Sequence, residues 1–265
     1  MNERSKSKKH NHKVVSEKTW LVQRKELLKK EKTFTRQRDE VSRQRCTLPW
    51  VKVEKPYVFD SPTGKKTLAD LFDGRSQLII YHFMFGPDPK WKEGCPSCSF
   101  LADHIDGANL HLPHHDVTLL VVSRAPLSKI KPFKKRMGWR FQWVSSFGSD
   151  FNFDYHVSFT RKEIAKGKIY YNYKMTEGGD EQPGISVFYK DKSGDVFHTY
   201  STYGRGGDLL IGAYNYLDLT PLGRNEKKGE GMDWMRHHDK YPDAGTVRRG
   251  SVSGKPMRTN NEPET

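Results

Sequence analysis

Two nearly continuous apolar runs, separated by a segment of helical length, constrain the fold of this 265-residue chain more than any other feature. The first run covers residues 78–85, with the sequence LIIYHFMF, and the second covers residues 117–122. Strands of this kind are typical of parallel or mixed sheets that are covered on both faces. The order strand, helix, strand further implies a right-handed crossover. The sequence therefore predicts an α/β fold with a central mixed sheet flanked by helices.

The segment before this unit predicts one long amphipathic helix. Residues 16–45 contain no Gly or Pro, and Ser16 is suited to the N-cap. An apolar residue recurs every seven positions along this helix, at Trp20, Leu27, Phe34 and Val41. We expect the stripe to pack on the domain; the alternative is that it pairs with the same helix of a second copy, as a homodimer.

The rest of the chain contains shorter patterns that predict further strands and helices. The pattern of apolar runs and turn residues predicts strands at 57–59 and 139–145, helices at 68–72, 97–110, 127–137 and 208–217, and a hairpin of strands 185–189 and 196–200. Residues 147–173 predict only a mixture of short helix and loop.

Composition divides the chain into a body and two polar ends. We expect a disordered basic tail over 1–13, the long helix within 14–50, one domain over 51–242 and a second disordered tail over 243–265. The net charge of +14 suits an acidic partner, but no nucleic-acid-binding motif accompanies it, so we do not expect nucleic acid as a partner. No apolar run reaches the roughly 20 residues of a membrane span, so we expect a cytoplasmic protein without a membrane partner.

The chemistry is concentrated in the motif Cys95-Pro96-Ser97-Cys98, which lies where the first strand passes into a helix. Gly94 frees the backbone to turn, Cys95 falls near the N-cap and Pro96 suits the first helical turn. The unpaired amides and the dipole at a helix N-terminus favour the thiolate form of Cys95. We therefore assign Cys95 as the nucleophile and Cys98, one turn on, as the thiol that resolves a mixed disulfide.

Two other interpretations of the cysteine pair remain open at this stage, an inert buried pair and a metal site. A metal site needs two further ligands, for which four histidines follow closely, but their spacing matches no standard zinc module, so we expect no metal and no cofactor. His82, inside the apolar strand, is a candidate for proton transfer, although a hydrogen-bonded core histidine is the more common arrangement. The four histidines are His104, His111, His114 and His115.

Several long motifs resemble one known family. The segments LADLFDGRSQLIIYHFM, GCPSCSFLADHIDGANLHLPHHDVTLLVVSRA, PGISVFYKD and FHTYSTYGRG, together with residues 133–150, are similar to a thioredoxin-like family of predicted dithiol-disulfide oxidoreductases first catalogued as a domain of unknown function. The resemblance covers nearly all of residues 14–241. It implies a thioredoxin-like fold and a redox role, and it places the family's paired cysteines on Cys95 and Cys98.

The resemblance also suggests how the site meets its substrate. Thioredoxin-like folds have a cis proline facing the dithiol, which exposes backbone to a substrate strand, and Pro183 holds that place here. The loop before the motif is an addition relative to thioredoxin and carries Trp91, which we expect to flank the substrate with Pro183 and Pro96. The spacing that identifies a peroxiredoxin fails, because Asp88 and Lys92 stand at its Pro and Thr or Ser positions.

Three functions are compatible with these observations. The first is a thiol-disulfide oxidoreductase acting on a protein or small-molecule thiol or disulfide, with an electron donor that the sequence does not identify. The second is a thioredoxin-like binding or scaffolding module that does not catalyse a reaction, and the third is a thiol peroxidase. Cys46, at the end of the long helix, is expected to take no part in the chemistry; the alternative is an intermolecular disulfide bridge.

Overall fold

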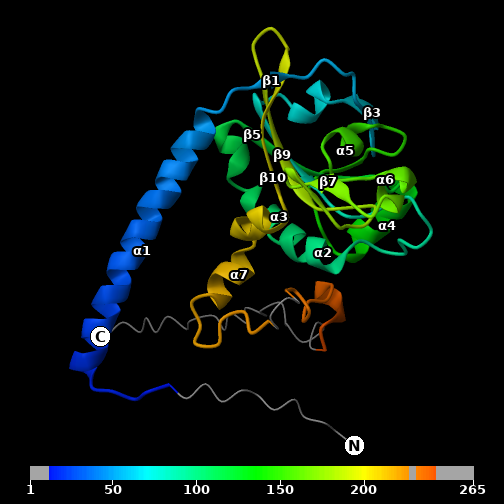
Figure 1. Cartoon of the computed structure of the whole chain (residues 1–265). Coiled ribbons are helices and arrows are strands. Elements are labelled where there is room, and N and C mark those ends of the chain that lie inside the picture. The colour runs from blue at the N-terminus through cyan, green and yellow to red at the C-terminus, as the bar shows by residue number, and fades with distance from the viewer. Residues whose placement is uncertain (1–11, 227–230, 243–265) are drawn as a thin grey trace, which may run out of the picture.

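The computed structural model describes residues 12–226 and 231–242 (Figure 1). The predicted tails, 1–13 and 243–265, lie almost wholly outside these residues. The helices are α1 (Glu17–Cys46), α2 (Pro96–Ala102), α3 (Ile105–Ala108), α4 (Leu127–Arg136), α5 (Phe151–Asp154), α6 (Arg161–Ala165) and α7 (Gly212–Leu217), with 3-10 helices η1 (Ala69–Phe72), η2 (Leu112–His115), η3 (Gly204–Leu210) and η4 (His238–Lys240). The strands are β1 (Val51–Lys52), β2 (Val58–Ser61), β3 (Gly64–Thr67), β4 (Gln77–His82), β5 (Val117–Ser123), β6 (Trp143–Ser145), β7 (Ile169–Tyr171), β8 (Lys174–Thr176), β9 (Gly184–Lys190) and β10 (Val196–Tyr203).

The central sheet is mixed and has the strand order β1-β10-β9-β4-β5-β6-β2-β3. The two apolar runs form β4 and β5, which pair in parallel, and β6 continues the parallel part. On its other side β4 pairs antiparallel with β9, the first strand of the predicted hairpin. A central strand with a crossover to a parallel neighbour, an antiparallel hairpin beside it and a dicysteine helix after it is a thioredoxin-like arrangement. The predicted fold class is confirmed.

Alternation along β4 divides the core between the two faces of the sheet. Tyr81 points into one apolar cluster, which includes Cys98 and residues of α2 and α4. Leu78 and Ile80 point into a second cluster, with Phe151 of α5, on the opposite face. Successive side chains of a strand point to opposite faces, so the sequence of β4 decides which groups can meet the cysteines.

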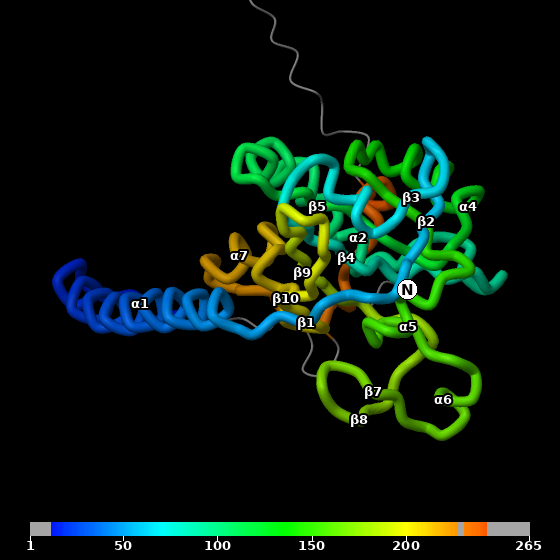
Figure 2. The backbone as a smooth tube through the Cα atoms, turned by 90° about the horizontal axis from the view of Figure 1, so that it is seen from above, coloured from blue at the N-terminus to red at the C-terminus, as the bar shows by residue number. Residues whose placement is uncertain are grey.

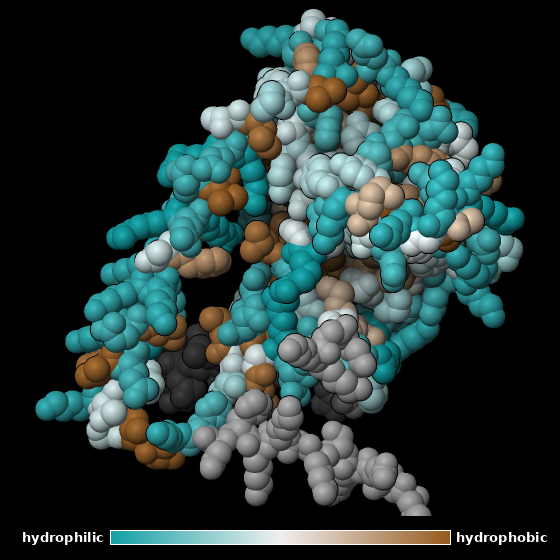
Figure 3. All heavy atoms as spheres, in the orientation of Figure 1, coloured by the Kyte–Doolittle hydropathy of each residue, from teal (hydrophilic) through white to brown (hydrophobic). Residues whose placement is uncertain are grey.

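The long helix α1 forms as predicted but does not pack on the domain. The Ser16 side chain accepts a hydrogen bond from the Thr19 amide and caps the helix, yet none of the helix's residues is buried. Trp20 is 55% exposed and Phe34 is 61% exposed. Figures 1 and 2 show α1 standing apart from the sheet, and Figure 3 shows apolar side chains among hydrophilic ones on its surface. The expectation that its stripe covers the domain is therefore wrong for the single chain.

Other elements differ from the predictions in their lengths. The helix predicted over 97–110 is divided into α2 and α3, since the His104 side chain bonds the Phe100 carbonyl that a continuing helix would use. The helix predicted over 208–217 is divided into η3, which begins earlier and includes the glycine-rich stretch, and α7, because Ile211 between them has an extended backbone. In the described part of the chain, no helix is long and apolar enough to cross a membrane.

Candidate active site

The dicysteine motif lies at the junction that the sequence predicts. Cys95 is the N-cap of α2, its amide donates a hydrogen bond to the Met84 carbonyl just beyond β4, and Pro96 is the exposed first residue of the helix. Gly94 is required for a reason that the sequence does not reveal. A Cβ at this position would come within 2.6 Å of the rings of both Phe83 and Phe133, so the loop can approach the core this closely only without a side chain.

The Cys95 thiol is half-buried and is surrounded by hydrogen-bond donors. Hydrogen bonding from the Cys98 thiol, followed by the Ser97 hydroxyl and the amides of Ser97 and Cys98, outweighs burial and lowers the pKa of Cys95 to about 6. The Ser97 Oγ lies 3.0 Å from the Cys95 Sγ. A thiol with this pKa is mostly thiolate at neutral pH, and the thiolate is the nucleophilic form of cysteine.

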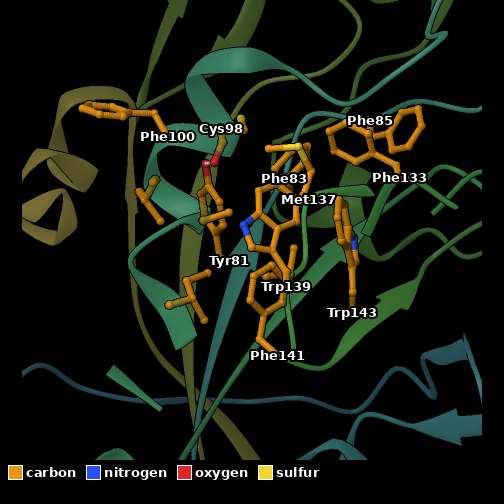
Figure 4. Close-up of a cluster of buried hydrophobic side chains, with 14 of the residues drawn as sticks. Tyr81, Phe83, Phe85, Cys98, Phe100, Phe133, Met137, Trp139, Phe141 and Trp143 are labelled. Atoms are coloured by element: carbon orange, nitrogen blue, oxygen red, sulfur yellow. Dashed lines mark hydrogen bonds between the residues drawn. The ribbon is translucent and has the colours of Figure 1, made fainter. Parts of the chain in front are cut away.

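The Cys98 thiol, one helical turn away, has the opposite character. It is 2% exposed, and burial first and its hydrogen bond to Cys95 second raise the pKa of Cys98 well above its ordinary value. The Met84 amide lies 3.5 Å from its Sγ, and the Tyr81 hydroxyl lies 3.5 Å from its carbonyl oxygen (Figure 4). The surroundings of the two cysteines therefore favour the thiolate form of Cys95 and the protonated form of Cys98.

A small hollow of about 60 Å³ adjoins the motif. Ser97 and Cys98 line it from α2, and Pro183 lines it from the segment before β9, as expected for a residue that faces the dithiol. The peptide bond before Pro183 is not cis, because the described residues contain no cis peptide bond. The expectation of a cis proline is therefore wrong, although the position of Pro183 beside the cysteines is as the resemblance implies.

His82 is not brought to the cysteines. It points to the opposite face of the sheet from Tyr81, where its ring stacks on Phe151 and its Nε2 lies 2.9 Å from the Ser186 hydroxyl. Burial lowers the pKa of His82 to about 3, so the ring stays neutral. These contacts are those of a hydrogen-bonded core histidine, the more common of the two arrangements considered from the sequence, and the sheet separates His82 from the thiols.

Trp91 lies in the added loop but does not line the hollow beside Cys98. Its indole Nε1 lies 3.3 Å from an oxygen of Asp180, and its ring packs closely over Gly86. Beside it, Glu181 is 2% exposed at its side chain and pairs with Arg124 at 3.1 Å. Burial, partly opposed by Arg124, raises the pKa of Glu181 to about 7. The role of Trp91 beside a substrate remains a prediction.

The four histidines after the motif do not meet the cysteines as a ligand set. His104 joins two helices, with its Nδ1 2.9 Å from the Phe100 carbonyl and its Nε2 accepting a hydrogen bond from the Ala213 amide at 3.1 Å. Within residues 12–226 and 231–242, no group of three or more His, Cys, Asp or Glu side chains is arranged to hold a metal ion.

The segment 231–242 contributes to the site in a way that the sequence reading missed. The buried His237 donates from Nε2 to the Gly94 carbonyl at 2.8 Å, and Met232 lines the hollow beside Cys98. Lys240 pairs with Glu93 at 2.6 Å in the same loop. The signal was the group of large apolar residues, Met232, Trp234 and Met235, within an otherwise polar segment.

Comparisons with known proteins identify a family for this chain. A family model described as "Bacterial protein of unknown function (DUF899)" matches residues 9–241. A solved peroxiredoxin Q from Xanthomonas campestris is 14% identical, with 64% of this chain and 98% of that chain covered and a TM-score of 0.41. A putative thiol:disulfide interchange protein DsbE from Chlorobium tepidum is 12% identical, with coverages of 63% and 98% and a TM-score of 0.38. The search of curated proteins gave no match. Identities this low carry no information on activity.

Proposed function

We propose that this chain, which belongs to the family of bacterial proteins of unknown function described as DUF899, is a thiol-disulfide oxidoreductase that uses Cys95 and Cys98. The observation that carries the proposal is the unequal state of two thiols in one helical turn. The half-buried Cys95 has its pKa lowered to about 6, whereas burial raises the pKa of Cys98. A nucleophilic cysteine needs a lowered pKa, so that it is a thiolate at neutral pH. A resolving cysteine should stay protonated until the mixed disulfide has formed, and a raised pKa keeps it so.

The proposed cycle begins when the Cys95 thiolate attacks one sulfur of a substrate disulfide. The substrate S–S bond breaks, a Cys95–substrate disulfide forms, and the released thiolate takes a proton from water. Cys98 then loses its proton to solvent and attacks the Cys95 sulfur, which releases the second substrate thiol and leaves a Cys95–Cys98 disulfide. The protein loses two electrons and the substrate gains them. An external thiol or dithiol reduces the protein again, which suits the cytoplasm, where such donors are abundant.

A redox titration against glutathione tests the proposal. The purified chain is equilibrated over a range of reduced-to-oxidised ratios, the remaining thiols are alkylated, and the Cys95–Cys98 disulfide is quantified by mass spectrometry. We expect reversible two-electron formation of this disulfide in the wild type and its loss in Cys95→Ser and in Cys98→Ser. Cys46→Ser is the matched control, because Cys46 is exposed at the end of α1, and it should titrate as the wild type.

Two other functions predict different results. A binding module with a vestigial pair predicts no intramolecular disulfide at any ratio. A thiol peroxidase is favoured by one observation, namely that Cys95 combines thiolate character with partial exposure, the two properties that govern oxidation by peroxide. For that function, hydrogen peroxide should convert Cys95 of the Cys98→Ser variant to a sulfenic acid faster than the same variant exchanges with a disulfide.

A further inference from the structure

Much of the backbone beside the dithiol is hydrogen-bonded within the chain. An extended polypeptide substrate usually binds by adding a strand to free amides and carbonyls of a protein. From Gly184 onward, β9 is paired on both sides, with β4 and with β10. Because β9 has no free edge, a substrate strand could bind only to the backbone of the segment before β9, which lies beside the cysteines.

That segment is paired as well. The Phe159 amide donates to the Asp180 carbonyl at 3.0 Å, Ser158 and Glu181 form an antiparallel bridge, and the Gln182 amide donates to the Val157 carbonyl at 2.8 Å. Residues 180–182 thus have residues 157–159 of the same chain beside them, where a substrate strand would add. Pro183, the next residue, has no amide hydrogen to offer.

Tyr171 occupies the carbonyl of Pro183. Its hydroxyl donates to the Pro183 carbonyl at 2.6 Å and accepts a hydrogen bond from the Gly204 amide at 2.7 Å, so it joins the two sides of the hollow. Tyr171 belongs to the β7–β8 hairpin, a separate two-stranded sheet. The hairpin is held on β10 by the edge-on contact of the Tyr171 and Tyr203 rings, whose centroids are 5.4 Å apart.

The hollow itself is small and mostly apolar. Its volume of about 60 Å³ is well below the roughly 300 Å³ of a typical small-molecule pocket. Tyr81, Leu101 and Ile185 form much of its wall. The hollow has room for an arm of a few heavy atoms beside Cys98, whereas a large side chain next to a polypeptide disulfide would extend beyond it.

From these observations we propose that the site takes compact disulfides, in which each sulfur carries only a short arm, and rejects disulfides held within extended polypeptide. The inference rests on the proposed oxidoreductase function and gives it a substrate class. Tyr171 is a positioning residue in this scheme, since it acts by occupying the Pro183 carbonyl and touches no reacting atom. The reaction is that of the proposed cycle, in which one compact disulfide becomes two thiols and the protein dithiol becomes a disulfide.

The test compares two substrates of the full chain, hydroxyethyl disulfide and insulin, with dithiothreitol as the electron donor and the uncatalysed rates subtracted. We expect kcat/KM for hydroxyethyl disulfide to exceed that for insulin by at least about tenfold. Tyr171→Phe keeps the ring contact with Tyr203 but frees the Pro183 carbonyl, and it should raise kcat/KM for insulin about fivefold, the effect of one hydrogen bond, with little change for hydroxyethyl disulfide.

Tyr173→Phe is the matched control. Tyr173 lies on the same hairpin and also packs on Tyr203, but it donates to the Ser201 carbonyl at 2.9 Å and not to the Pro183 carbonyl, so this variant should leave the ratio of the two kcat/KM values unchanged. Wild-type reduction of insulin as fast as of hydroxyethyl disulfide would overturn the inference and leave the proposed function standing. No turnover of either substrate, with no Cys95–Cys98 disulfide in glutathione, would overturn both.

Discussion

The helices α1 and α2 correspond to the two clearest patterns in the sequence, the heptad stripe and the dicysteine motif, but they differ in how much of each helix is buried. α1 has 30 residues and buries none of them, whereas α2 has seven residues and buries five. The long helix shows its apolar stripe to solvent, while the short one is held against the sheet, against α7 and against segment 231–242. A strong periodic pattern predicts that a helix forms, but only packing partners elsewhere in the chain decide what it does.

The largest expected difference between α1 and α2 is in how much each contributes to the free energy of unfolding. Phe100 in α2 is 9% exposed and has ring contacts with His104, Tyr214 and Trp234. Phe100→Ala should lower the free energy of unfolding by about 3 kcal/mol, since it removes buried apolar surface and leaves a cavity. Urea unfolding followed by circular dichroism measures this loss. A change within experimental error would mean that α2 is not anchored by this ring.

The next effect is on the pKa of Cys95. Because this pKa is lowered to about 6, the thiolate forms as pH rises through 6, and the rate of alkylation should increase with it and level off above it. Cys98→Ala removes the leading donor and should move the pKa towards the ordinary 8.5, which lowers the thiolate fraction at neutral pH about tenfold. Cys98→Ser retains a donor and should show a smaller rise.

Thiolate absorbance in the ultraviolet, followed against pH in each variant, gives these values directly. If Cys98→Ala and Cys98→Ser titrate alike and with the wild-type midpoint, then Cys98 does not set the reactivity of its neighbour. The helix amides would then be the main cause, as the position of Cys95 at a helix N-terminus predicts.

A smaller effect is expected at Ser97, whose hydroxyl is the second donor to the Cys95 sulfur. Ser97→Ala should raise the pKa of Cys95 by less than about one unit, because the Cys98 thiol and the amides remain in place. The same absorbance titration measures the change. If the pKa of Cys95 rises as much in Ser97→Ala as in Cys98→Ala, then the Cys98 thiol is not the stronger of the two donors.

The smallest effect is expected in α1. Phe34 is 61% exposed, so Phe34→Ala should change the free energy of unfolding of the single chain by less than about 0.5 kcal/mol. A homodimer formed through α1 would instead make Phe34 important for stability. In that case sedimentation velocity should show a concentration-dependent dimer in the wild type that weakens in Phe34→Ala, and the stability loss should grow with protein concentration.

The parts of the site that the sequence predicts correctly depend on local signals. Cys95 at the N-cap and Pro96 in the first turn follow from the residues themselves, and the hydrophobic runs of β4 and β5 follow from their length. The side of β4 on which His82 lies depends on the register of the strand, which an apolar run does not specify. A one-residue change of register would have placed it with the cysteines.

Other parts could not be predicted, because they depend on contacts between distant segments. The Tyr171 hydroxyl reaches Pro183 through the β7–β8 hairpin, and the sequence of residues 147–173 predicts only short helix and loop there. The packing of α1 could not be predicted either, since a stripe of apolar residues shows which side of a helix is apolar and not what covers it. The resemblance to a family supplied the fold and the paired cysteines, but it predicted a cis Pro183 that is absent here.

The hydrogen bond from His237 to the Gly94 carbonyl joins residues 143 positions apart in the sequence. During synthesis, the cysteines therefore emerge long before the residue that fixes the loop in front of them. The nascent chain carries two thiols in an unfinished loop, and only the late arrival of segment 231–242 gives that loop its final form. The two cysteines are thus synthesised well before the residues that complete the surroundings of the loop.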